Sequence, residues 1–289
     1  MLVEILDVLI AGLLLGGLFA ISAVGLSLQY GVARVLNVAH GEFIMLGAFI
    51  TWFLYTAHGI NPLLSLIISG PIVFVVGIFL YRTLFTRLRK ISPTAGAFEG
   101  NSMLACFGLL FIIQNGAILI WGADIKGYSY LAFPVNLWGA KFAANRLVTL
   151  AFALVICLVF YLFLSRTRMG KAIRASAQDP ETAGLMGVRI TQVLALCFGF
   201  GALMAGLGGA LISMSYKIEP TMGFEYTMIA LIVIVLGGLG SIPGSLLGGL
   251  ILGLVGSIVT HIEPGLALVA YYLIFMVLLL AKPTGILGK

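Results

Sequence analysis

The side chains of this chain that could do chemistry gather in one short polar stretch between two apolar runs. Asn37, His40 and Glu42 lie within the segment NVAHGE, near a predicted membrane boundary. Ionisable groups at membrane depth usually mark a function, so we assign these three residues and Gly41 to a translocation pathway. A solvated cytoplasmic turn is the alternative. His40 and Glu42 do not predict a metal site, because two ligands without a third do not hold an ion.

No catalytic motif accompanies these residues. A phosphate-binding loop requires G-x-x-x-x-G-K-[ST], and the nearest match is Gly170-Lys171. Ser165 stands where that loop needs its first glycine, and Ala172 stands where it needs a hydroxyl residue. No HExxH motif and no Ser-His-Asp constellation occurs, and the glycine-rich strings follow no predicted soluble strand. We therefore expect a protein that is not an enzyme and that binds neither a cofactor nor a metal itself.

The composition places the chain in a membrane. Of its 289 residues, 61% are hydrophobic and only 9% are charged, whereas a soluble domain carries roughly a quarter charged residues. One spanning helix needs about 20 apolar residues, so about eight or nine spans use up the chain. We predict an all-α, polytopic membrane protein with one transmembrane domain over 1–289. Its three cysteines lie in apolar runs at no ligand-like spacing, which indicates buried packing residues.

The cations predict the orientation of the chain, because Lys and Arg concentrate in cytoplasmic loops. Twelve of the sixteen Lys and Arg residues would be cytoplasmic if Arg34, 82–90, 166–189 and the C-terminal tail lie inside. The pattern indicates topology and not nucleic-acid binding. No cation precedes Arg34, so the first segment is no cleaved signal and its N-terminus lies outside. Nine crossings satisfy this topology, with the C-terminus inside; eight full spans plus broken or re-entrant helices are the alternative.

A second interruption of the apolar pattern lies in the other half of the chain, at 236–249. Its members are small or helix-breaking residues, and those assigned to the pathway are Gly237, Gly238, Gly240, Pro243 and Gly244. Interrupted helices recur along transport pathways, although small residues also serve close helix packing. Two interruptions in corresponding positions suggest an internal repeat. Gln114 and Asn115, within an apolar run, either bond across helices or line the pathway.

The longest polar island is the predicted cytoplasmic loop 165–191. Within it, 169–177 predicts a short amphipathic helix that includes Arg174. Asp179 then suits a helix cap, Pro180 the first helical position, and Glu181 the positive end of the helix dipole. The residues that follow offer a small apolar surface and a glycine stop, and they are Ala183, Leu185, Met186 and Gly187. Such a helix fits a groove on a partner; an interfacial helix lying on lipid headgroups is the alternative.

These motifs carry a resemblance to a known family. Glu181-Thr182-Ala183-x-x-x-Gly187 resembles the E-A-A-x-x-x-G loop of bacterial ATP-binding cassette (ABC) importer permeases, with Thr182 in place of the usual alanine. The longer string 169–188 resembles the permeases of high-affinity branched-chain amino acid importers. The stretches 37–42 and 235–244 are similar to two further characteristic stretches of that family.

The resemblance implies a permease subunit in the bacterial inner membrane that pairs with a second, homologous permease. Two cytoplasmic ATPases and a periplasmic binding protein would complete the importer. The ATPases would hold ATP and magnesium and contact the 174–187 segment. The binding protein would dock on the outer loops 122–146 and 216–224. Its substrates would be branched-chain or other small amino acids, or related amides, urea or carboxylates. A channel or facilitator that works without ATP and a sugar-type ABC permease are the alternatives.

Overall fold

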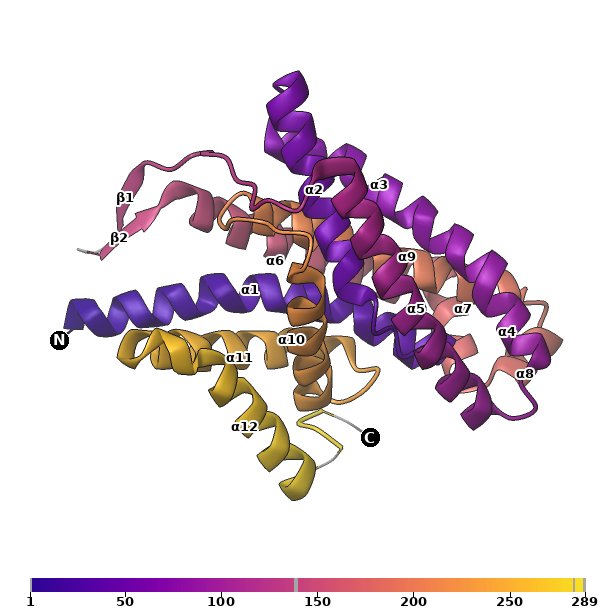
Figure 1. Ribbon diagram of the computed structural model, residues 1–289. Coiled ribbons are helices and arrows are strands. Elements are labelled where there is room, and N and C mark those ends of the chain that lie inside the picture. Colours follow the sequence, from indigo (N-terminus) through magenta and orange to yellow (C-terminus); the bar gives the residue numbers. More distant parts are fainter. Residues whose placement is uncertain (1, 138–139, 283, 288–289) are drawn as a thin grey trace.

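The computed structural model describes residues 2–137, 140–282 and 284–287, and it is a bundle of long helices (Figure 1). A short hairpin of β1 (Pro134–Leu137) and β2 (Ala140–Ala143) leaves the bundle at one end. The helical elements are, in chain order, α1 (Leu2–Ala33), α2 (His40–His58), α3 (Pro62–Leu80), the π-helical turn η1 (Tyr81–Phe85), α4 (Thr86–Ile91), α5 (Ala95–Trp121), α6 (Ala144–Arg166), α7 (Arg168–Gln178), α8 (Pro180–Leu185), α9 (Ile190–Ser213), α10 (Met222–Gly237), α11 (Ile242–Ile262), the 3₁₀ turn η2 (Pro264–Leu266) and α12 (Ala267–Ala281).

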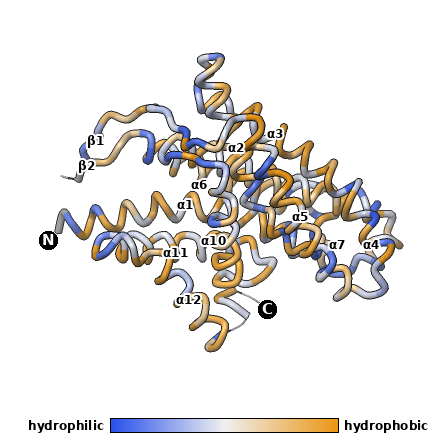
Figure 2. Tube along the Cα trace, viewed as in Figure 1, coloured by the Kyte–Doolittle hydropathy of each residue, from blue (hydrophilic) through white to orange (hydrophobic). Residues whose placement is uncertain are grey.

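Seven helices of the described residues are long and apolar enough to cross a membrane, and apolar residues line most of their length (Figure 2). Two further helices fall short of that criterion. α2 opens with the polar residues His40 and Glu42, and α10 has only 16 residues. At 1.5 Å per residue α10 spans about 24 Å, less than a hydrocarbon core of about 30 Å. The prediction of an all-α membrane protein with about eight or nine spans, some of them broken, is confirmed.

Small residues bring α1 and α11 together along most of their lengths. The two helices run antiparallel, with Gly12 beside Leu254 and Gly16 beside Leu250. A Cβ atom on either glycine would lie 2.8 Å from the partner's Cα atom, so no larger residue fits. In lipid, where burial supplies no driving force between helices, such close backbone packing holds a bundle together. The four-residue glycine spacing therefore serves packing in this part of the chain.

The two halves of the bundle repeat one arrangement with opposite chain directions. α9 packs antiparallel along α3, with Gly77 against Ala202 and Gly206 against Val73, as α11 packs along α1. α1 and α9 also run antiparallel to each other at the centre, where Gly208 lies beside Ile21. The order α1, α2, α3 thus corresponds to α9, α10, α11. The predicted internal repeat is present as an inverted one.

The repeat corrects the predicted pairing of the two interruptions. The break before α2, at 34–39, corresponds to the break before α10, at 214–221, and not to 236–249. The sequence could not reveal this because 214–221 follows the end of α9 and reads as an ordinary external loop. The structure shows that 214–221 is equivalent to 34–39, because each of these breaks precedes a helix that starts inside the bundle.

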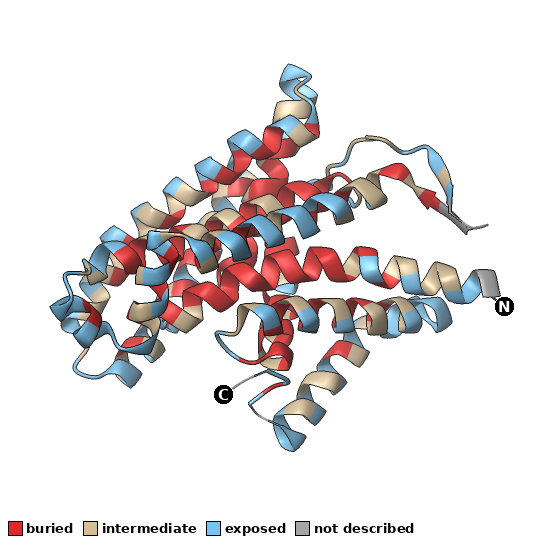
Figure 3. Ribbon diagram, turned by 180° about the vertical axis from the view of Figure 1, so that it is seen from behind, coloured by how far each residue is buried: buried red, intermediate tan, exposed pale blue. Residues whose placement is uncertain are grey.

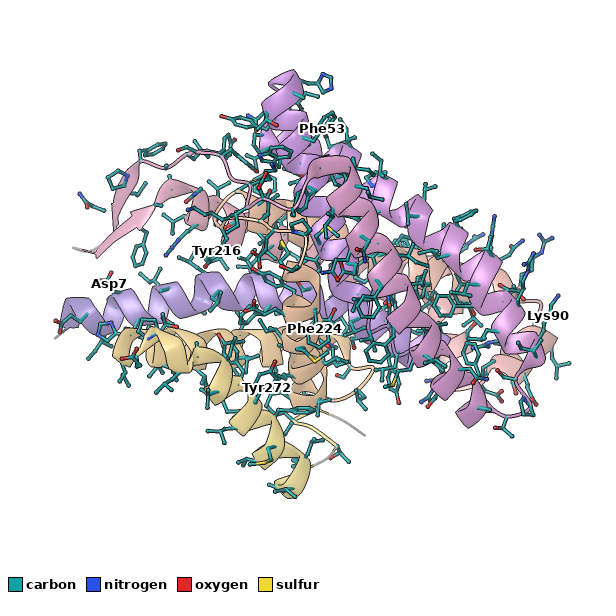
Figure 4. The ribbon with its side chains drawn as sticks, viewed as in Figure 1. Asp7, Phe53, Lys90, Tyr216, Phe224 and Tyr272 are labelled. Atoms are coloured by element: carbon teal, nitrogen blue, oxygen red, sulfur yellow. The ribbon has the colours of Figure 1, made fainter. Side chains whose placement is uncertain are left out.

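Cationic side chains gather at one end of the bundle. There the Nη2 atom of Arg89 donates a hydrogen bond of 2.9 Å to the carbonyl oxygen of Ala33, which ties α4 to the end of α1. Lys90 lies at this end and Asp7 at the opposite one (Figure 4). Buried residues concentrate midway between the two ends, along α1, α9 and the start of α2 (Figure 3).

Candidate functional site

A buried polar cluster joins the start of α2 to the middle of α1. The amide of Asn37 donates to Oε1 of Gln29 at 3.0 Å, and the amide of Gln29 donates to the carbonyl oxygen of Phe198 at 3.0 Å. His40 places Nε2 2.9 Å from the carbonyl oxygen of Ser22 and Nδ1 3.3 Å from Gln29 Oε1. All of these side chains are buried, so the alternative of a solvated turn is wrong.

The N-termini of α2 and α10 meet inside the bundle, and the two helices run away from this point in opposite directions (Figure 1). The amide of Gly41 donates to Oγ1 of Thr227 at 2.8 Å, and that hydroxyl donates to the carbonyl oxygen of Gly223 at 3.1 Å. A Cβ on Gly41 would overlap the Gly223 carbonyl oxygen. Only glycines allow this approach.

The carboxyl group of Glu42 lies at the same junction. It packs against Gly223, it is fully buried, and neither of its oxygens has a hydrogen-bond partner in the described residues. Both helices present the positive ends of their dipoles there, which favours negative charge. The predicted pathway residues of the first half therefore sit together, at a junction with α10.

The predicted pathway residues of the second half lie at the other end of α10. Gly237 and Gly244 pack backbone against backbone, and a Cβ on either one would overlap the other. Gly238 and Gly240 have φ angles of +103° and +78°, a conformation that favours glycine. Pro243 lies in the first turn of α11, where its missing N–H costs no hydrogen bond.

The two predicted pathway regions are therefore separated and not adjacent. The 16 residues of α10 lie between them. Gly240 instead packs against Gly31 of α1, since a Cβ on Gly31 would lie 2.8 Å from its Cα atom. The carbonyl groups at the end of α10 are bound from the C-terminal segment, where Ile286 N–H donates to Leu236 at 2.8 Å and Leu287 N–H donates to Gly237 at 3.1 Å.

Gln114 and Asn115 lie apart from both regions. Asn115 is exposed on α5 and donates to the carbonyl oxygen of Phe111 in its own helix at 2.8 Å. Gln114 is half-buried and makes no hydrogen bond within the described residues. Neither residue bonds across helices or joins the central junction, so the structure does not bring them together with the other pathway residues.

The predicted docking loop forms two short helices, as the sequence indicated. Thr167 caps α7, with its Oγ1 accepting from Gly170 N–H at 3.0 Å. A Cβ on Gly170 would overlap the carbonyl oxygen of Leu164, so glycine is required for the sharp turn out of α6. Ile173 faces the bundle, while Arg174 is exposed. The amphipathic pattern therefore lays α7 across the cationic end.

The helix α8 is held by its predicted cap. Oδ1 of Asp179 accepts from the amides of Glu181 at 3.0 Å and Thr182 at 3.1 Å, and the Thr182 hydroxyl donates to Oδ2. The Thr182 side-chain hydrogen bond, followed by the backbone ones, lowers the pKa of the Asp179 carboxyl below its ordinary value. Pro180 occupies the first turn, and Gly187 follows the helix with a φ angle of +86°.

The exposed face of α8 is apolar. Leu185 is 89% exposed and Met186 is 81% exposed. Ala183, predicted to belong to the contact surface, is buried, and its carbonyl oxygen accepts a hydrogen bond from Val188 N–H at 3.1 Å. It therefore supports the helix from behind, and the face open to a partner consists of Leu185, Met186 and the exposed carboxylate of Glu181.

A crevice connects α7 with the glycine loop at the end of α10. It has a volume of about 260 Å³, and its walls include Arg174 and Ile173 of α7, Gly240 and Pro243, and Ser27 of α1. The hydroxyl of Ser27 is buried without a hydrogen-bond partner. Residues of the predicted docking loop and two of the predicted pathway residues, Gly240 and Pro243, therefore line one space.

The opposite end of the bundle is aromatic. Tyr128 donates or accepts a hydrogen bond of 2.9 Å with Ser213, and burial raises the pKa of its phenol to about 12. The loops that follow α5 and α9 join through an antiparallel bridge between Lys126 and Ile218. Residues 138 and 139 of the predicted binding-protein contact lie outside the described residues.

Sequence reasoning missed Gln29 and Thr227. Gln29 begins the polar stretch that leads to Asn37, and Thr227 lies inside an apolar run; neither belongs to a motif, yet each binds a residue of the 37–42 segment. The only available signal was their polarity at membrane depth, the same signal that drew attention to Gln114.

Comparison with known proteins decides the family. Residues 8–281 match the family described as branched-chain amino acid transport system / permease component. The chain belongs to this family. It is 31% identical to the high-affinity branched-chain amino acid transport system permease protein BraD of Pseudomonas aeruginosa over 98% of this chain and 96% of that one.

Other relatives and one solved structure are also similar to this chain. The permease LivH of Escherichia coli K12 is 30% identical over 96% of this chain and 94% of its own. A fructose import permease of Rhizobium meliloti is 26% identical over 88% of this chain. The solved structure of PsaBC from Streptococcus pneumoniae in complex with Fab covers 96% of this chain and 91% of its own at a TM-score of 0.53 and 13% identity, which shows a shared fold.

Proposed function

We propose that this chain is the membrane-spanning permease subunit of an ABC importer for branched-chain or other small amino acids. The observation that carries the proposal is α8, which presents Leu185 and Met186 to solvent at the cationic end. Two such apolar side chains contribute about 1.5–3 kcal/mol each when a partner buries them. The protein has no ATP site of its own by motif, so the energy comes from ATP and magnesium on two partner ATPases that receive α8.

The cationic end is the cytoplasmic one in this proposal. It carries Arg34, Arg89 and the docking loop, in agreement with the concentration of cations on the inner side of membrane proteins. The N-terminus then lies outside and the C-terminus inside. The aromatic end, with the bridged outer loops, faces the periplasmic binding protein. A second, homologous permease completes the translocation pathway.

Coupling would run from α8 through α7 to the pathway. Closure of the ATPases on ATP would displace α8, and α7 would carry the displacement to the crevice that Arg174 shares with Gly240. From there α10 would transmit it to the junction of Gly41 and Gly223, where two helix starts meet without side chains between them. Rigid helices joined at glycine contacts move as bodies and alternate access to the pathway.

Reconstitution in liposomes tests the proposal. The assembled importer, with radiolabelled leucine and its binding protein outside, is expected to accumulate substrate only when ATP is inside. The chain without ATPases is expected to show no flux. Flux from this chain alone, insensitive to ATP, would establish the channel alternative, and fructose uptake in place of leucine uptake would establish the sugar alternative. A ligand screen on the cognate binding protein identifies the substrate.

A further inference from the structure

A second crevice at the cationic end lies beside the proposed coupling path and is lined partly by α7 and by Pro180 of α8. It has a volume of about 410 Å³ and opens between the loop that precedes α5 and the turn between α7 and α8. Its walls include Arg34 at the end of α1, Arg89 of α4, Thr94 before α5, and Ser176 and Gln178 of α7. Four separate segments of the chain thus converge on it.

Two arginines, Arg34 and Arg89, line the crevice, and the guanidinium carbon of Arg34 lies 5.9 Å from the centre of the Tyr30 ring. The carbon atom of the Arg89 guanidinium lies 4.7 Å from the centre of the Phe98 ring, and Nη2 is held by Ala33, but Nε is buried without a hydrogen-bond partner. Arg34 has a φ angle of +54°, which a non-glycine residue rarely adopts. No carboxylate lies among the residues that line the crevice.

The start of α5 adds oriented N–H groups. Thr94 caps this 27-residue helix by accepting from Ala97 N–H at 3.1 Å. The amides of Ala95 and Gly96 have no partner within the described residues. Unsatisfied N–H groups at the positive end of a long helix favour an anion.

A buried hydroxyl in the wall supplies independent evidence for a ligand. Ser176 is 1% exposed, and its Oγ has no hydrogen-bond partner among the described residues. Buried polar groups are almost always paired, and leaving one unpaired costs free energy. Ser176 and Arg89 thus both line the crevice, and each carries a buried polar atom, Oγ and Nε, without a hydrogen-bond partner in the described residues.

We infer that this crevice binds a phosphate-bearing anion, through Arg34, Arg89, the start of α5 and the Ser176 hydroxyl. Guanidinium groups and helix N-termini are the groups that recognise phosphate oxygens in proteins. The phosphate group comes either from an anionic phospholipid headgroup or from free phosphate. The bound anion joins the start of α5 to the turn that leads into α8. The inference holds whether or not α8 docks on an ATPase.

Amide hydrogen exchange tests the inference on the full chain in its assembled complex. Nanodiscs of phosphatidylcholine alone are compared with the same nanodiscs plus inorganic phosphate, at matched ionic strength, and with nanodiscs that contain phosphatidylglycerol. A ligand that binds only the folded, closed form of a segment slows amide exchange that proceeds through local opening. At a ligand concentration of about ten times the dissociation constant, the slowing is ~10-fold. We expect that slowing at the bonded amides of 97–98 and in 175–179.

Three variants give the controls. Arg34→Gly removes one guanidinium at a position where glycine fits the backbone, and Ser176→Ala removes the hydroxyl with little change in volume. Arg87→Ala removes an exposed cation that does not line the crevice. Protection is expected to fall several-fold in the first two variants and to stay unchanged in Arg87→Ala.

The outcomes separate the two sources. Protection by both probes, lost in Arg34→Gly, supports a phosphate site open to free phosphate. Protection by phosphatidylglycerol alone, lost in Arg34→Gly, supports a lipid headgroup site. No protection by either probe, or protection that survives in Arg34→Gly and Ser176→Ala, overturns the inference.

Discussion

Gly41 and Gly223 touch backbone to backbone where the first turns of α2 and α10 meet. The Gly41 amide and the Gly223 carbonyl oxygen are both bound by the one hydroxyl of Thr227. The contact joins the two inverted halves of the bundle at its centre. It leaves no space for a side chain, which gives each of the two helices a fixed starting point against the other.

Gly41→Ala is predicted to destabilise the protein and abolish transport. The added methyl group would overlap the Gly223 carbonyl oxygen. That oxygen and the Cα atom of residue 41 both belong to buried backbone that cannot move aside. Overpacking of this kind costs about 1–3 kcal/mol or more. Thermal unfolding of the purified complex measures the loss. Gly108→Ala on α5 is the control, because its Cβ would have no atom within 4 Å. Equal unfolding temperatures for the two variants would contradict the packing account.

Gln29→Leu is predicted to destabilise the buried cluster. It would leave the Asn37 amide and the Phe198 carbonyl oxygen without the Gln29 side chain as their partner. Each buried polar group that loses its partner costs about 1–3 kcal/mol. Gln114→Leu makes the same chemical change at a site without hydrogen bonds and is expected to be nearly neutral. Unfolding of both variants by guanidinium or by heat measures the difference in stability. A smaller loss of stability in Gln29→Leu than in Gln114→Leu would argue against the network.

The helix α8 is predicted to stay folded as the pH falls to low values. The pKa of Asp179 is lowered from its ordinary 3.8, so its cap contributes stability above that value and loses it as the pH falls through the lower folded pKa. Exchange protection of the Glu181 and Thr182 amides should therefore be constant from neutral pH to about pH 4, once corrected for the intrinsic rate. Asp179→Ala should remove the protection at every pH. A loss near pH 6 would show that another group holds the helix.

Labelling of single cysteines tests the orientation. The three native cysteines are buried, so an introduced thiol supplies the signal. Asn136→Cys in β1 is expected to react with an impermeant maleimide in right-side-out vesicles, and Met186→Cys is expected to react in inside-out vesicles. Both positions are exposed in the structure, so a thiol that fails to react with the maleimide lies on the inner side of the vesicle membrane. The reverse pattern would place the cationic end outside.

Local chemistry could be predicted from the sequence, and long-range contacts could not. The cap at Asp179 and the stop at Gly187 follow from rules that act within a few residues, and both occur as predicted. Gly41 and Gly223 are 182 positions apart, as their residue numbers give by subtraction, and no periodicity connects them. Gln29 begins the polar stretch that leads to Asn37, where polarity alone does not name its partner. The pairing of the halves therefore required the structure.

The docking of α8 on an ATPase is the central claim, and ATP hydrolysis by the assembled importer tests it most directly. In nanodiscs, hydrolysis is measured with and without substrate-loaded binding protein for the wild type, for a Leu185→Ser and Met186→Ser double variant, and for Ile91→Ser. Ile91 is a matched control because it is 75% exposed at the same end but outside α8. Loss of two apolar side chains that the ATPase would bury, at about 1.5–3 kcal/mol each, predicts at least a ~10-fold fall in stimulated hydrolysis for the double variant alone. Wild-type stimulation in the double variant, with the complex intact, would contradict the account.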